Sequence, residues 1–162
     1  PVKPSPNLPN NLAIALYPSL CPFEGTSVSV GRGTTYPFQV IGSPVLKDFF
    51  QFQFIPRSLK GFDKHPLHQN QTCFGLDLRT EKEFPQGFSL KYLLQFYRLY
   101  QKQYPDAEKR FFSRSQWFDL LMGTSQVRKD ILQGKTESEI RQAWEKDLQA
   151  YRSLREKYLL YE

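Results

Sequence analysis

One short segment of this 162-residue chain concentrates the side chains that are best suited to chemistry. It holds one carboxylate, Glu24, and one guanidinium, Arg32, among several hydroxyl side chains and the glycines Gly25, Gly31 and Gly33. Glycine permits positive φ and lets a ligand approach backbone N–H groups closely. The segment therefore suits a ligand that is both polyhydroxylated and anionic.

The spacing of the segment excludes two common phosphate-binding motifs. A P-loop needs Lys and then Ser or Thr after its last glycine, and a dinucleotide fingerprint needs its glycines between a strand and a helix. Here two threonines follow, and then aromatic and β-branched residues that favour a short strand. Pro37 and Pro44 confine that strand to a sheet edge or a strand start. We therefore expect Glu24 and Arg32 on a long loop that leads into an edge strand.

The same segment resembles a known protein family. It contains the pattern Tyr-Pro-x-x-Cys-x-Phe-Glu-Gly-Thr-x-x-Ser-x-Gly-Arg-Gly-Thr-Thr-x-Pro-Phe. This pattern is similar to that of the NamZ-type exo-β-N-acetylmuramidases, long described as a domain of unknown function. Further motifs follow in the family's order, among them Phe118-Asp119-x-Leu121-x-Gly123-Thr124 and Glu139-Ile140-x-x-x-Trp144. The resemblance covers nearly the whole chain.

The resemblance implies that residues 1–162 form a single domain, the C-terminal domain of a longer protein. Family members carry a Rossmann-like N-terminal domain before the matching part, and this missing domain is the expected partner. The opening residues Pro1–Pro4 agree with that reading, since they are neither an initiator Met nor the start of a signal peptide. The implied location is the cell envelope, periplasmic or secreted.

The activity implied for the parent protein is exo-acting glycoside hydrolysis, which releases terminal N-acetylmuramic acid from peptidoglycan fragments. Such hydrolysis needs two carboxyl groups, or one carboxyl group with help from the substrate's own acetamido group. The resemblance puts the active site between the two domains and the principal carboxylates in the missing one. This chain would then be the second wall of the substrate cleft, with no cofactor and no metal expected.

On that wall the first candidate for substrate binding is Arg32, because an arginine fork can hold the lactyl carboxylate of N-acetylmuramic acid. Glu24 is the candidate catalytic residue, which could also accept sugar hydroxyls or hold Arg32 in place. Further hydrogen bonds would come from Gly25, Thr26, Gly33 and Thr34. An internal Glu24–Arg32 salt bridge that ties the loop to the domain is the alternative, and it does not exclude binding. Val30 stands where many relatives carry an acidic residue.

Other function classes stay open. A non-catalytic glycan-binding module and a purely structural domain are the alternatives to a wall of the active site. A nucleic-acid binder is remote, because the charges that sum to +6 are interspersed and the tyrosines keep helical spacing. No run of about eighteen apolar residues is present, so no membrane span is expected.

Cysteine and histidine give little sign of a metal or redox site. Cys21 and Cys73 are far apart in sequence, and either a free pair or a disulfide is open because spacing alone cannot fix their geometry. His65 and His68 lie in a polar segment broken by proline, with no thiol or carboxylate to complete a metal site. We expect them on a surface loop.

Periodicity predicts an α+β fold. Up to about Pro85 the chain is rich in proline, glycine and short apolar runs, which indicates loops and a small mixed sheet. A short helix over residues 10–17 is expected to stop at the following proline. Residues 45–53 form helix or strand, and residues 73–80 alternate as a half-buried strand. The polar face of that strand carries Asp77 and its neighbouring arginine, either as a solvent-facing or cross-strand pair or as ligand contacts.

Three or four helices are expected to follow and to pack against the first part. A tyrosine-rich helix over residues 89–104 would bury one stripe in the core. Capping boxes at Ser113 and Thr136 predict two helix starts, and a short helix between them runs from Thr124 to Gly134. The last helix carries an apolar stripe of Ile140, Trp144, Leu148, Tyr151, Leu154 and Tyr158. We expect the domain's own core to bury it, with a partner-binding face as the alternative.

Overall fold

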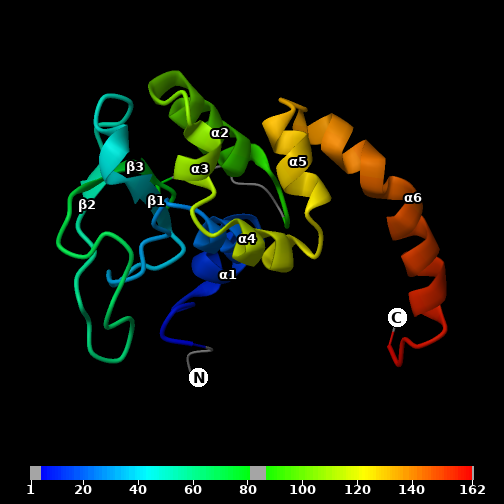
Figure 1. Cartoon of the computed structure of the whole chain (residues 1–162). Coiled ribbons are helices and arrows are strands. Elements are labelled where there is room, and N and C mark those ends of the chain that lie inside the picture. Colours follow the sequence, from blue (N-terminus) through cyan, green and yellow to red (C-terminus); the bar gives the residue numbers. More distant parts are fainter. Residues whose placement is uncertain (1–4, 81–86, 162) are drawn as a thin grey trace.

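The computed structural model describes residues 5–80 and 87–161, and it has the predicted α+β class (Figure 1). The elements are α1 (Asn11–Leu20), the 3-10 turn η1 (Cys21–Gly25), β1 (Val40–Ser43), the 3-10 turn η2 (Pro44–Leu46), β2 (Gln53–Phe54), β3 (Cys73–Asp77), α2 (Lys91–Gln103), α3 (Ala107–Phe111), α4 (Ser115–Met122), α5 (Gln126–Leu132) and α6 (Glu137–Glu156). The predicted boundary at Pro85 and the opening residues Pro1–Pro4 lie outside the described residues.

The sheet has the strand order β1-β3-β2, and both strand pairs are antiparallel where a mixed sheet was predicted. β1 is an edge strand, as expected, although it begins only at Val40 because the preceding residues form turns. Two backbone hydrogen bonds of 2.8 and 2.9 Å join Ser29 to Gly42 in β1. The glycine-rich segment, residues 24–35, is thereby attached to the sheet.

An aromatic core fixes η1 in place. The ring of Phe23 in η1 is fully buried and lies edge-on to Phe96 of α2 and Phe111 of α3, with ring centroids 5.7 and 6.4 Å apart. The tyrosine-rich helix α2 buries its stripe here as predicted, with Tyr97 and Tyr100 inside the core. Because Phe23 is anchored in this way, the next residue in the chain has a fixed position at the edge of the core.

α1 continues beyond the predicted stop. Its start is capped by the Asn10 side chain, and the helix runs through Pro18 to Leu20. The prediction that Pro18 ends the helix is wrong. Proline in the last turn removes only one N–H, and the N–H of Cys21 still donates to the carbonyl of Tyr17, so the helical path leads directly into η1.

The two predicted capping boxes have different outcomes. The box at Ser113 is wrong: α4 has Arg114 as its N-cap residue, without a side-chain hydrogen bond. Arg114 has a non-helical φ of −132° and ψ of 59°, so α4 begins one residue later than predicted, and the N–H of Arg114 donates to the carbonyl of Gly25 at 3.1 Å. The box at the start of α6 is confirmed, since Thr136 Oγ1 accepts from the N–H of Glu139 and the Glu139 carboxylate accepts from the N–H of Thr136.

The remaining elements of the first part resolve the open alternatives. Residues 45–53 form mainly η2 and a turn, with β2 beginning only at Gln53. The guanidinium of Arg79 binds both carboxylate oxygens of Asp77 at 2.8 Å, so the two residues form a solvent-facing pair at the end of β3. Cys21 and Cys73 are both free.

α6 departs most from expectation. Ile140 is buried and Trp144 packs edge-on against Phe88, but farther along the stripe Tyr151 and Leu154 are 60% and 52% exposed. Figure 1 shows the second half of α6 extending away from the other helices. The prediction that the domain's own core buries the whole stripe is therefore wrong beyond the first two turns. No helix within residues 5–80 and 87–161 has both the length and the apolar character required to cross a bilayer.

Candidate functional site

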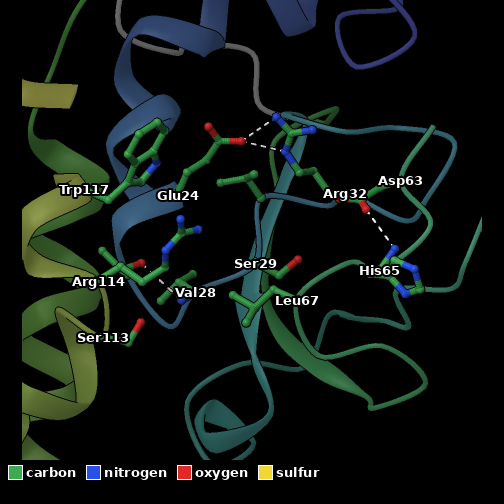
Figure 2. Close-up of a pocket in the computed structure, with 12 residues that line it drawn as sticks. Glu24, Val28, Ser29, Arg32, Asp63, His65, Leu67, Ser113, Arg114 and Trp117 are labelled. Atoms are coloured by element: carbon green, nitrogen blue, oxygen red, sulfur yellow. Dashed lines mark hydrogen bonds and ion pairs between the residues drawn. The ribbon is translucent and has the colours of Figure 1, made fainter. Parts of the chain in front are cut away.

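A pocket of about 420 Å³ lies where η1 and the glycine-rich segment meet α4 and the loop after β2 (Figure 2). Its lining residues are Glu24, Thr26, Val28, Ser29, Val30, Arg32, Asp63, His65, Leu67, Ser113, Arg114 and Trp117. Three of the predicted site residues, Glu24, Thr26 and Arg32, line this pocket, whereas Gly25, Gly33 and Thr34 do not. The pocket therefore joins three segments that are far apart in sequence.

Glu24 and Arg32 form the expected ion pair on one wall. The Nε and Nη2 atoms of Arg32 lie 2.6 and 2.5 Å from Oε1 of Glu24. The Glu24 side chain is 19% exposed and that of Arg32 is 32% exposed, so the pair sits at the pocket surface. Arg32 also lies over the ring of Phe38, 5.3 Å from its centroid. The pair holds the glycine-rich segment against η1, and two donors of the Arg32 fork are occupied by doing so.

The buried threonines of the segment bond to its own backbone. Thr26 Oγ1 donates to the carbonyl of Phe23 at 2.8 Å and accepts from the N–H of Val28. Thr34 Oγ1 donates to the carbonyl of Gly31 at 2.6 Å. Both threonines are less than a tenth exposed. Their hydroxyl groups therefore shape the loop, and their hydrogen bonds are made within it.

The two glycines expected to bind ligand are sites of close packing. A Cβ on Gly25 would lie 2.5 to 2.6 Å from three atoms of Phe118 in α4, two of them backbone atoms. Gly33 has a φ of +79°, and its carbonyl accepts from the N–H of Arg57 at 2.8 Å. A Cβ on Gly33 would also meet Pro66 at 2.5 Å. These glycines bring α4 and the loop after β2 close enough to complete the pocket.

Trp117 and Arg114 are pocket residues that sequence reasoning missed. Trp117 is 41% exposed, and the Cζ atom of Arg114 lies 5.5 Å from its ring centroid. Arg114 is the N-cap residue of α4 and Trp117 lies in the first turn, so the two side chains share one face at the start of the helix. No local pattern, however, connects that face to residues 24–32. The connection is the close contact between Gly25 and Phe118.

The histidine loop forms the far side of the pocket. His65 is exposed, as predicted, and its backbone N–H donates to Oδ1 of Asp63 at 3.0 Å. His68 is half-buried, and its Nε2–H donates to the carbonyl of Ser27 at 2.8 Å, so the expectation of a surface residue is wrong there. Burial lowers the pKa of His68, although the bond to Ser27 acts in the opposite direction. His68 thus anchors the loop to Ser27.

Metal binding finds no support in the parts of the chain that the structure describes. Within those residues, no three His, Cys, Asp or Glu side chains gather closely enough to hold an ion. The chemistry available at the pocket is that of one paired carboxylate, a second carboxylate on Asp63, the exposed imidazole of His65, two guanidinium groups, several hydroxyl groups and an exposed indole. That set suits recognition of an anionic, ring-shaped ligand by hydrogen bonds and stacking.

The contribution of the ion pair can be measured by a double-mutant cycle. Glu24→Gln and Arg32→Gln are each expected to lower the free energy of unfolding by about 1 to 2 kcal/mol, because each leaves a half-buried partner unpaired. The double variant should lose less than the sum, with a coupling energy of about 1 kcal/mol. Urea denaturation of the four proteins measures this coupling. Additive losses would show that the pair does not stabilise the loop.

Comparison with solved structures shows where this fold has been seen. The chain superimposes on a DUF1343 family protein from Bacteroides fragilis NCTC 9343 with a TM-score of 0.84 and 42% identity, covering 100% of this chain and 44% of that one. A second DUF1343 family protein from the same organism gives a TM-score of 0.68 at 19% identity, which shows a shared fold only. The chain spans less than half the length of both proteins.

Sequence comparison agrees. The chain is 32% identical to the peptidoglycan β-N-acetylmuramidase NamZ of Bacillus subtilis (strain 168) over 99% of its own length and 40% of that protein. Residues 15–161 match the family model described as exo-β-N-acetylmuramidase NamZ, C-terminal. The resemblance seen in the glycine-rich segment is therefore confirmed, and the chain belongs to the NamZ C-terminal domain family.

Proposed function

We propose that this chain is the C-terminal domain of an exo-acting glycosidase that releases terminal N-acetylmuramic acid from peptidoglycan fragments. In this proposal its pocket forms one wall of the substrate cleft. The observation that carries it is the pocket itself, which combines Arg32, Arg114 and the exposed ring of Trp117 in a member of this family. Guanidinium groups suit the lactyl carboxylate of the sugar, and an indole suits the apolar face of its ring.

The reaction needs carboxyl groups on both sides of the scissile bond, or one with substrate participation. Glu24 and Asp63 are the carboxylates that line the pocket. Oε1 of Glu24 is held by Arg32, and Oδ1 of Asp63 accepts a backbone hydrogen bond. Because these oxygen atoms already accept hydrogen bonds, the two carboxylates are better suited to positioning and binding a ligand than to proton transfer. We therefore place the principal catalytic carboxylates in a further domain, and we keep Glu24 as the residue of this wall that can contact a sugar hydroxyl.

The partner in this proposal is the rest of the longer protein. A largely apolar groove of about 520 Å³ lies between α1, α4 and α6, lined by Tyr17, Cys21, Leu121, Trp144 and others. It continues onto the exposed half of α6. η1 and α4 line both this groove and the pocket that contains Glu24 and Trp117. One neighbouring domain can therefore cover the groove and the pocket together. The proposed location is the cell envelope, where peptidoglycan is found.

Binding and turnover can be tested separately. The 162-residue chain is expected to bind N-acetylmuramic acid weakly and to leave a chromogenic N-acetylmuramic acid glycoside intact, whereas the longer protein hydrolyses it. Two-dimensional NMR titration of the chain should shift the Trp117 indole signal first, because that ring is exposed in the pocket. If the longer protein, like the 162-residue chain, binds the sugar but does not hydrolyse the glycoside, the result would support a glycan-binding module. If neither protein binds the sugar, the result would support a purely structural domain.

A further inference from the structure

The two guanidinium groups of the pocket are in different states. Arg32 donates two N–H groups to one oxygen of Glu24, so its positive charge is already balanced. Arg114 is exposed at the pocket, and its guanidinium makes no hydrogen bond or ion pair with any residue in the described parts of the chain. Its contact is the ring of Trp117. One arginine is therefore neutralised and the other is available to an anion.

The available arginine is also well positioned. The backbone N–H of Arg114 donates to the carbonyl of Gly25, and its carbonyl accepts from the N–H of Phe118, which is fully buried. The guanidinium lies against the indole of Trp117. Figure 2 shows both side chains on the α4 side of the pocket, across from the Arg32 side chain. The backbone position of Arg114 is thus fixed by contacts that leave its charge free.

An anion meets different conditions at the two arginines. At Arg32 it would lie close to the carboxylate of Glu24, and like charges at such distances repel. Displacing Glu24 would also break two charge-assisted hydrogen bonds. At Arg114 the anion gains a charge-assisted bond and breaks none. Binding at Arg114 is therefore the less costly choice.

We propose that Arg114, and not Arg32, holds the carboxylate that distinguishes N-acetylmuramic acid from N-acetylglucosamine, with Trp117 packed against the sugar ring. This inference rests on the proposed function, and it revises the sequence-based expectation that Arg32 is the carboxylate ligand. Arg32 then acts as a positioning residue that orients Glu24 toward the pocket.

The test compares two sugars and a neutral analogue on matched variants. N-acetylmuramic acid, its lactyl amide and N-acetylglucosamine are titrated by NMR into the wild-type chain, Arg114→Gln, Arg114→Lys and Arg32→Gln, each first shown to be folded by circular dichroism. The wild type should prefer the acid to the amide by about ten-fold, the gain expected of one charge-assisted bond. Arg114→Gln should lose that preference and Arg114→Lys should keep part of it, whereas Arg32→Gln, which also removes the partner of Glu24, should lose less of it than Arg114→Gln does. Trp117→Ala should weaken the binding of all three ligands equally.

Several outcomes would overturn the inference. One is an unchanged acid preference in Arg114→Gln, and another is a preference lost only in Arg32→Gln. If the wild type binds all three ligands equally, Arg114 does not select the acid, although the glycan-binding function stands. If the wild type binds none of them, the proposed function fails together with the inference.

Discussion

Gly25→Ala is expected to lower the free energy of unfolding by about 3 kcal/mol or more, at the upper end of the cost of overpacking. The added Cβ would lie 2.5 Å from Cβ and 2.6 Å from Cα and the backbone nitrogen of Phe118. Backbone atoms of a helix cannot move aside as the end of a flexible side chain can, so α4 must shift together with its buried Phe118. Arg114 and Trp117 lie on α4 or at its N-cap. The same substitution should therefore weaken ligand binding at the pocket.

Gly61→Ala is the matched control for that experiment. Gly61 has a φ of +85°, and no atom lies within 4 Å of the position that its Cβ would take. Its alanine variant should lose about 1 kcal/mol through backbone strain alone. Urea denaturation followed by circular dichroism compares the two variants, and NMR titration compares their sugar binding. A loss in Gly25→Ala no larger than that in Gly61→Ala would show that η1 and α4 are less tightly packed than the structure indicates.

Ile140→Ala should cost about 2 to 4 kcal/mol, because it removes a fully buried aliphatic side chain and leaves a cavity. Leu154→Ala is the control on the same helix. Leu154 is 52% exposed, so its truncation should change the free energy of unfolding of the isolated chain by no more than about 0.5 kcal/mol. Thermal and urea denaturation of the two variants measure the difference.

The same two variants test the proposed contact between a neighbouring domain and the exposed half of α6. In the longer protein, Leu154→Ala should become more costly than in the isolated chain, because the neighbouring domain would bury the exposed half of α6. Ile140→Ala should cost the same in both proteins. If the cost of Leu154→Ala does not change, the neighbouring domain does not cover this part of α6.

Local signals predicted much of the fold. The tyrosine stripe of α2 and the capping box of Thr136 and Glu139 depend on neighbours within one or two helical turns, and both are confirmed. The wrong predictions concern features that depend on contacts between residues far apart in sequence. The box at Ser113 fails because Arg114 is not helical, and the N–H of Arg114 bonds to Gly25 in a distant part of the chain. The apolar stripe of α6 has helical periodicity along its whole length, but periodicity does not state which part of a stripe is covered by the same chain.

Only part of the candidate site was predicted, because some of its residues are close in sequence and others are brought together by the fold. Glu24 and Arg32 are close in sequence, and their types and spacing were enough to predict a pair beside glycines. Arg114 and Trp117 come from a helix about ninety positions later in the chain, and only the tertiary packing of Gly25 on Phe118 brings them to the pocket. Glycine itself is ambiguous in a sequence, because close approach to a ligand and close approach to a helix need the same missing Cβ.

Backbone hydrogen bonds hold the frame of this pocket. Ser29 is bonded to Gly42, Arg114 is bonded to Gly25, and the carbonyl of Gly33 accepts from the loop after β2. None of these bonds depends on a side chain that projects into the pocket. The side chain of Arg114 can therefore be replaced while these bonds are kept: under the proposed function, an acidic residue at this position should shift the preference of the pocket from acidic sugars to amino sugars. For protein engineering, Arg114 is the position where the lining can be changed without touching the Glu24–Arg32 ion pair, on which part of the stability depends.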